Sequence, residues 1–177
     1  ADHEVTHVPV LANPGTIAAP ICEPYAVTLD GDTAWVSCFS YNGDFGQGPV
    51  IGVDIPSRSL NGKVLALPNS TTASFGEVRD GVMVFAHQNN DGVAFFDVTA
   101  DPPVLISDVT FLDPTVCALP HVARFSEDGT KVFAVCEGAG HAEPGTFIVI
   151  DAAAHQVIGH VALGLYPDDI AIVRLPQ

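Results

Sequence analysis

Asp128-Gly129-Thr130-Lys131-Val132-Phe133-Ala134-Val135-Cys136 decides the fold, because its pattern occurs three times in the chain. Each copy has an Asp-Gly pair, a short apolar run and a distinctive last residue. The other copies cover 30–38 and 80–87, and the three end residues, Cys38, His87 and Cys136, are evenly spaced. A fixed period of this kind indicates a repeat protein.

A second apolar run follows each copy and ends in an aspartate. These runs are Val50–Asp54, Val93–Asp97 and Phe147–Asp151. Each unit holds about four runs of four to six residues rich in Val, Ile and Phe, separated by Gly, Asp, Asn and Pro, which are strand signals. Four strands in a unit of roughly 40–50 residues are typical of a β-propeller blade. The sequence therefore predicts an all-β fold, a partial β-propeller.

Three blades are expected at about 24–71, 72–119 and 120–167, with one extra strand at each end, over 3–10 and 169–174. Closed propellers have 4–8 blades. Three blades and two single strands would form an open arc with apolar flanks and unpaired strand edges. We expect a second copy or a different chain to complete the ring, unless the chain is part of a longer propeller.

The repeat resembles the YVTN-type β-propeller family. The residues that carry the resemblance are the strand before each Asp-Gly turn, the run after it, and the third strand ending in Asp54, Asp97 or Asp151. The resemblance implies the architecture and a secreted or periplasmic setting. It does not imply one activity, because propellers carry many unrelated functions.

The charge of the chain disfavours several classes of partner. Six basic residues stand against 21 acidic ones, which gives a formal net charge of −15. Such a surface repels nucleic-acid phosphates and anionic lipid headgroups. The acidity suits a basic partner, cations or simply a well-solvated surface. No apolar run approaches the ~20 residues of a membrane helix.

Four cysteines occupy matching places in the first and third units. Cys22 precedes a strand and Cys38 ends the next, and Cys117 and Cys136 repeat this arrangement. Because adjacent antiparallel strands bring such positions opposite one another, we predict disulfides Cys22–Cys38 and Cys117–Cys136. Free thiols or thiolates on a metal are the alternatives. Disulfides persist in oxidising compartments, so a periplasmic or extracellular location is expected.

A set of histidines forms the sharpest candidate site. His87 replaces the cysteine of its repeat, and His121 begins an inner strand at the place of Tyr25 and Phe75. Both are predicted at one end of the channel, within reach of His141 in the loop after Cys136. With Glu137 or Glu77 they would suit zinc or copper. Ordinary hydrogen-bonded or surface histidines are the alternative.

This arrangement also resembles the periplasmic zinc metallochaperone propellers. The matching residues run from Cys117 through Pro120-His121 to Cys136, together with His3 and His7 near the N-terminus. The resemblance implies a zinc-binding carrier.

No catalytic motif is present in the sequence, which lacks GxSxG, HExxH and a glycine-rich phosphate loop. Asp168-Asp169 are interpreted as turn residues. The expanded loop 39–49 carries Tyr41 and Phe45, which suit contact with a protein partner. The leading hypothesis is therefore a non-enzymatic extracytoplasmic module that binds proteins or acts as a scaffold, and the alternative is a zinc or copper carrier.

Overall fold

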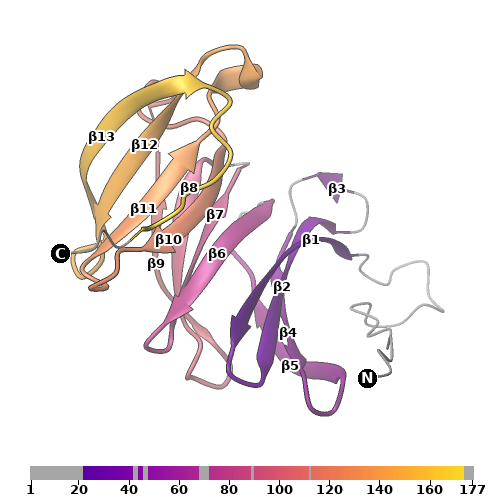
Figure 1. The fold of residues 1–177 in the computed structure, drawn as a ribbon. Coiled ribbons are helices and arrows are strands. Elements are labelled where there is room, and N and C mark those ends of the chain that lie inside the picture. The colour runs from indigo at the N-terminus through magenta and orange to yellow at the C-terminus, as the bar shows by residue number, and fades with distance from the viewer. Residues whose placement is uncertain are drawn as a thin grey trace.

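Three four-stranded antiparallel blades lie side by side in an open arc (Figure 1). The structure is a computed structural model, and it describes residues 22–41, 44–45, 48–67, 72–88, 90–111 and 113–173. The all-β partial propeller predicted from the repeat is confirmed. The strand predicted over 3–10 lies outside the described residues. No helix in the described part of the chain has both the length and the apolar character needed to cross a membrane.

The first blade has the strand order β1-β2-β4-β5. Its strands are β1 (Cys22–Asp30), β2 (Thr33–Tyr41), β4 (Val50–Asp54) and β5 (Ser59–Leu65). A two-residue strand, β3 (Asp44–Phe45), pairs with the end of β2. The loop that carries the predicted partner-binding residues is therefore partly an extension of the β2 edge.

The second and third blades join at their inner strands into one eight-stranded sheet, because β6 and β10 pair in parallel at Phe75 and Val122. The second blade contains β6 (Ala73–Arg79), β7 (Val82–His87), β8 (Gly92–Asp97) and β9 (Val104–Thr110). The third contains β10 (Pro120–Phe125), β11 (Lys131–Cys136), β12 (Pro144–Asp151) and β13 (Gln156–Leu165). A short 3₁₀ helix, η1 (Ala139–His141), lies between β11 and β12.

The repeated Asp-Gly pairs and strand-ending aspartates shape turns. Gly31, Gly81 and Gly129 have φ of 54°, 79° and 73°, a region that glycine enters at little cost. The other repeated set is Asp54, Asp97 and Asp151. Hydrogen bonds from the following turn lower the pKa of all three carboxyl groups, with Ser57, Thr99 and the backbone of Ala154 as the strongest donors. Their repetition is therefore explained by local structure.

The two faces of the second blade pack against different neighbours, because side chains alternate along each strand. Val84 and Phe95, both fully buried, lie in one apolar cluster with Ile148 of the third blade. The opposite face, which includes Phe85, shares a second cluster with Trp35 of the first blade. The middle blade is thus covered on both sides, and these two clusters hold the arc together.

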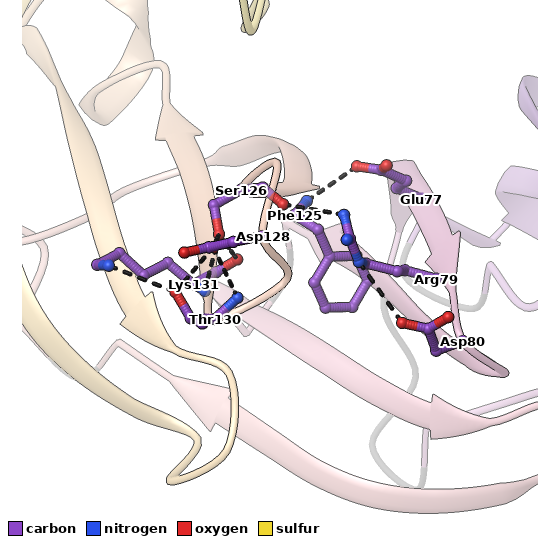
Figure 2. Close-up of polar contacts among 8 residues, drawn as sticks. All are labelled: Glu77, Arg79, Asp80, Phe125, Ser126, Asp128, Thr130 and Lys131. Atoms are coloured by element: carbon purple, nitrogen blue, oxygen red, sulfur yellow. Dashed lines mark hydrogen bonds and ion pairs between the residues drawn. The ribbon is translucent and has the colours of Figure 1, made fainter.

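Polar contacts add a second link between the middle and third blades (Figure 2). The backbone N–H of Phe125 donates to the Glu77 carboxylate at 2.8 Å, and the Arg79 guanidinium donates to the carbonyl of Ser126 at 3.1 Å. Arg79 also approaches Asp80 at 3.6 Å. Glu77, one of the carboxylates considered as a metal ligand, is therefore engaged in joining two blades.

The C-terminal segment lies beside the inner strands without pairing into them. Residues 166–173 have no strand assignment, although a strand was predicted over 169–174. Ile170 and Ile172 line an open groove of about 450 Å³ together with inner-strand residues such as Val27 and Arg124. The segment thus follows the course of a fourth inner strand, and the next strand of such a blade, with which it would pair, is not among the described residues.

Candidate metal site at the start of the inner strands

Residues near the start of the three inner strands meet at one end of the arc. Tyr25 of β1, Phe75 of β6 and His121 of β10 occupy equivalent places in their blades, as expected from the sequence. The Phe75 and His121 rings stack at 5.4 Å with an interplanar angle of 17°. The Tyr25 ring lies 5.3 Å from Phe75 and 5.8 Å from His121. Neighbouring inner strands that run in the same direction bring these positions together.

Asp168 adds a carboxylate at the corresponding place after the third blade. Its Oδ1 lies 3.6 Å from His121 Nε2, and its side chain is 68% exposed. The sequence pattern predicts that Asp168 is a turn residue. The sequence nevertheless contains a signal for its place beside His121: the pair Pro167-Asp168 repeats the pairs Pro24-Tyr25 and Pro120-His121.

Glu137 supplies a second carboxylate from the opposite side of the imidazole. It follows β11 directly, is only 2% exposed, and its Oε1 contacts His121 Nδ1. Its backbone N–H donates to the carbonyl of Leu119 at 3.0 Å. The disulfide Cys117–Cys136 joins the segments that carry His121 and Glu137. The local chain course therefore fixes the buried Glu137 beside the ring.

His121, Glu137 and Asp168 together form a group with ligand atoms within 4.8 Å of one another. It is the one such group of three among the residues that the structure describes. One imidazole nitrogen and carboxylate oxygens are donors that zinc accepts. Two members are buried and one is exposed, so solvent reaches the group from the Asp168 side.

The hydroxyl of Tyr25 also contacts this group. It lies 3.2 Å from His121 Nε2. Partial burial, followed by the negative charges of Glu137, Asp168 and Tyr166, raises the pKa of the Tyr25 phenol above 10.0. Burial is the largest cause of this shift, and the nearby negative charges add to it; those charges at the start of the inner strands favour a cation there.

His87 lies outside this group. It is fully buried, and its Nε2 lies 2.7 Å from Asp108 Oδ1 on the outer strand β9. Gly92 leaves the space for this contact, since a Cβ there would lie 2.5 Å from His87 Cε1. The His87–His121 combination predicted from the sequence is therefore not brought together in the structure; each imidazole has its own carboxylate.

Other predicted site residues are described only in part. His141 lies in η1, Tyr41 in β2 and Phe45 in β3, but their side chains are outside the description. His3 and His7 lie outside the described residues. Their roles stay predictions. Both expected disulfides are present, with Cα–Cα distances of 5.0 Å for Cys22–Cys38 and 5.4 Å for Cys117–Cys136.

The fold and the site define a class, a propeller-type blade arc with a histidine–carboxylate group at the start of its inner strands. No protein-family model matches the chain. No curated protein matches it either.

Solved structures share the fold. Hydrazine synthase from Kuenenia stuttgartiensis is similar with a TM-score of 0.57 and 16% identity, over 80% of this chain and 37% of that one. The apo form of AztD from Citrobacter koseri is similar with a TM-score of 0.50 and 15% identity, over 82% of this chain and 48% of that one. The chain spans less than half the length of either, and identities this low show the fold alone. The YVTN assignment stays a resemblance.

Proposed function

We propose that this chain is an extracytoplasmic propeller module that binds one divalent transition-metal ion, zinc before copper, at His121 and Asp168 with the help of Glu137. The observation that carries the proposal is the convergence of an imidazole and two carboxylates within 4.8 Å at the start of the inner strands. The role is binding, with no catalytic step.

Three further features support the proposal. The formal net charge of −15 attracts cations over a long range. The exposed Asp168 gives an ion a path to the buried imidazole. The two disulfides support a location outside the cytoplasm. The sequence resemblance to periplasmic zinc metallochaperone propellers points in the same direction.

Zinc titration of the disulfide-bonded protein, by competition with a chromophoric chelator, tests the proposal. We expect about one ion per chain, because one ligand group is present among the described residues. His121→Ala should weaken binding by more than the roughly 10–100-fold typical of changes around a first shell, because a ligand itself is lost. His160→Ala, on an exposed residue of β13, is the matched control. Zinc binding by His121→Ala with the affinity of the unmodified protein would exclude this site.

A second candidate function is association with a protein partner. It is favoured by the face of the third blade that carries Phe133 and Val149, called the free face below. The sheet register places Phe133 opposite Val149, as Val84 is opposite Phe95 in the middle blade. In the middle blade this face is completely buried by the third blade. In the third blade Phe133 and Val149 are only partly buried. The apolar face that the third blade covers on the middle blade is thus repeated on the third blade, where no described part of the chain buries it completely.

We propose that a sheet of the same propeller type, from a second copy or an unlike chain, covers this face and extends the ring. Sedimentation velocity at micromolar concentration should show a species larger than the monomer. Phe133→Asp should shift it toward the monomer, because a charge in an apolar interface costs desolvation free energy. Ile106→Asp, on the exposed outer strand β9, should leave it unchanged. If the unmodified protein is a monodisperse monomer, a second copy does not cover this face. An unlike chain is then the only partner that the proposal allows.

A further inference from the structure

The two ring nitrogens of His121 have different surroundings, and the difference assigns a role to each neighbour. Nδ1 contacts the buried Glu137 carboxylate, whereas Nε2 faces the Tyr25 hydroxyl and Asp168. A neutral imidazole has one N–H donor and one bare nitrogen. A carboxylate accepts and does not donate. Glu137 is in hydrogen-bond contact with Nδ1, whereas Asp168, at 3.6 Å, is beyond hydrogen-bond distance of Nε2, so the proton is assigned to Nδ1 and the lone pair to Nε2.

The Nδ1 side is already occupied by the Glu137 carboxylate. Bonds of about 2.0–2.1 Å from zinc to nitrogen and oxygen place two tetrahedral ligand atoms roughly 3.3 Å apart. Glu137 Oε1 and His121 Nδ1 are in direct hydrogen-bond contact, so the carboxylate stands where an ion on this nitrogen would be. Glu137 is also 2% exposed, so an ion could reach it only after rearrangement of the buried segment.

The Nε2 side has the spacing that an ion requires. Asp168 Oδ1 lies 3.6 Å from Nε2, near the separation of two zinc ligands, and its side chain is open to solvent. With the proton assigned to Nδ1, the Tyr25 hydroxyl, 3.2 Å from Nε2, donates to the lone pair that a metal would use. The Tyr25 ring is held against Phe39 at 5.2 Å and Phe75 at 5.3 Å. Protein zinc sites use Cys, His, Asp and Glu, so the phenol competes with the ion and is not a ligand.

We infer that His121 binds the metal through Nε2, that Glu137 is a positioning residue acting through Nδ1, and that the Tyr25 hydroxyl is a cap that the arriving ion displaces. This inference rests on the proposed metal-binding function. Carboxylate–histidine–metal arrangements of this kind fix the tautomer and raise the basicity of the ligand nitrogen. The exposed Asp168 completes the protein ligands on the open side.

Nitrogen-15 NMR of the unmodified chain tests the assignment without any substitution. Long-range ¹H–¹⁵N spectra of the apo protein should show the His121 proton on Nδ1. After addition of ¹¹³Cd²⁺, scalar coupling to the metal should appear at Nε2 and not at Nδ1. Coupling at Nδ1 would overturn the inference, because the metal would then occupy the place given to Glu137.

Two variants then separate the roles of Glu137 and Tyr25. Glu137→Gln should weaken zinc binding about 10–100-fold and mix the two His121 tautomers in the apo spectrum. Its control is Glu143→Gln, which removes one charge from an exposed residue. Tyr25→Phe should tighten binding about two- to tenfold, the value of one ordinary hydrogen bond. Unchanged or weaker binding by Tyr25→Phe, or equal behaviour of the two glutamine variants, would contradict the inference.

The outcomes also separate this inference from the proposed function. If His121→Ala binds zinc as well as the unmodified chain, the proposed site itself is wrong. If His121→Ala loses zinc while coupling appears at Nδ1, the site stands and only the division of roles fails. If Glu137→Gln does not fold, the NMR assignment on the unmodified chain still decides the question.

Discussion

Replacing Phe95 by alanine is expected to reduce the free energy of unfolding by about 3–5 kcal/mol, the usual cost of removing a fully buried aromatic side chain. Phe95 is 0% exposed in the cluster between the middle and third blades, and its ring also lies 4.6 Å from His155. The substitution would leave a cavity in the interface that holds the third blade. Chemical denaturation followed by circular dichroism measures the effect.

The matched control is the same substitution on the free face. Phe133 lies on the third blade, is partly exposed, and has one aromatic neighbour, Phe147, at 5.3 Å. Phe133→Ala should cost about 1–2 kcal/mol, since the ring is only partly buried. The comparison is made at a concentration where the chain does not associate. Equal losses from the two variants would mean that the free face is covered, and would contradict the open arc.

Reduction of the two disulfides is expected to have a comparably large effect. Cys22–Cys38 and Cys117–Cys136 span sequence separations of 16 and 19 residues. Each is worth about 3 kcal/mol in the chain-entropy model. Both bridges are buried in blade cores, so reduction should lower the melting temperature substantially. Differential scanning calorimetry with and without reductant measures it.

Single-bridge variants locate the effect within the arc. Replacing Cys117 and Cys136 by alanine should also weaken zinc binding, because this bridge joins the segments that carry His121 and Glu137. Replacing Cys22 and Cys38 by alanine should destabilise the first blade and disturb the ligand group less. The link between bridge and site would be refuted by equal zinc affinity in both double variants.

The blade architecture was predictable because its signals are local. Alternating apolar residues, the Asp-Gly pairs and the strand-ending aspartates each act within a few residues of chain, and the structure uses them as strands and turns. The cysteine pairs were predictable for the same reason, since each joins the end of a second strand to the start of, or the segment just before, the inner strand of the same blade. The convergence of Tyr25, Phe75 and His121 followed from equivalent places in successive repeats.

The composition of the ligand group depended on contacts between segments far apart in the chain. The sequence pattern predicts His87 beside His121, because His87 ends a strand and His121 begins one at the same end of the channel. Tertiary structure separated them: Gly92 lets the His87 ring reach Asp108 on the outer strand, while His121 lies between Glu137 and Asp168. Side-chain direction at a strand end is set by the neighbouring packing, which a strand pattern does not encode.

The sequence by itself thus determined the repeat, the blade, its turns and its disulfides, since these arise from short-range patterning along one strand or hairpin. Only the tertiary structure decided which carboxylate contacts which imidazole, and which apolar face stays partly exposed. Those outcomes depend on how whole blades stack. The free energy of that stacking comes from side chains such as Phe95 and Ile148, which belong to one buried cluster between two blades and are far apart in the chain.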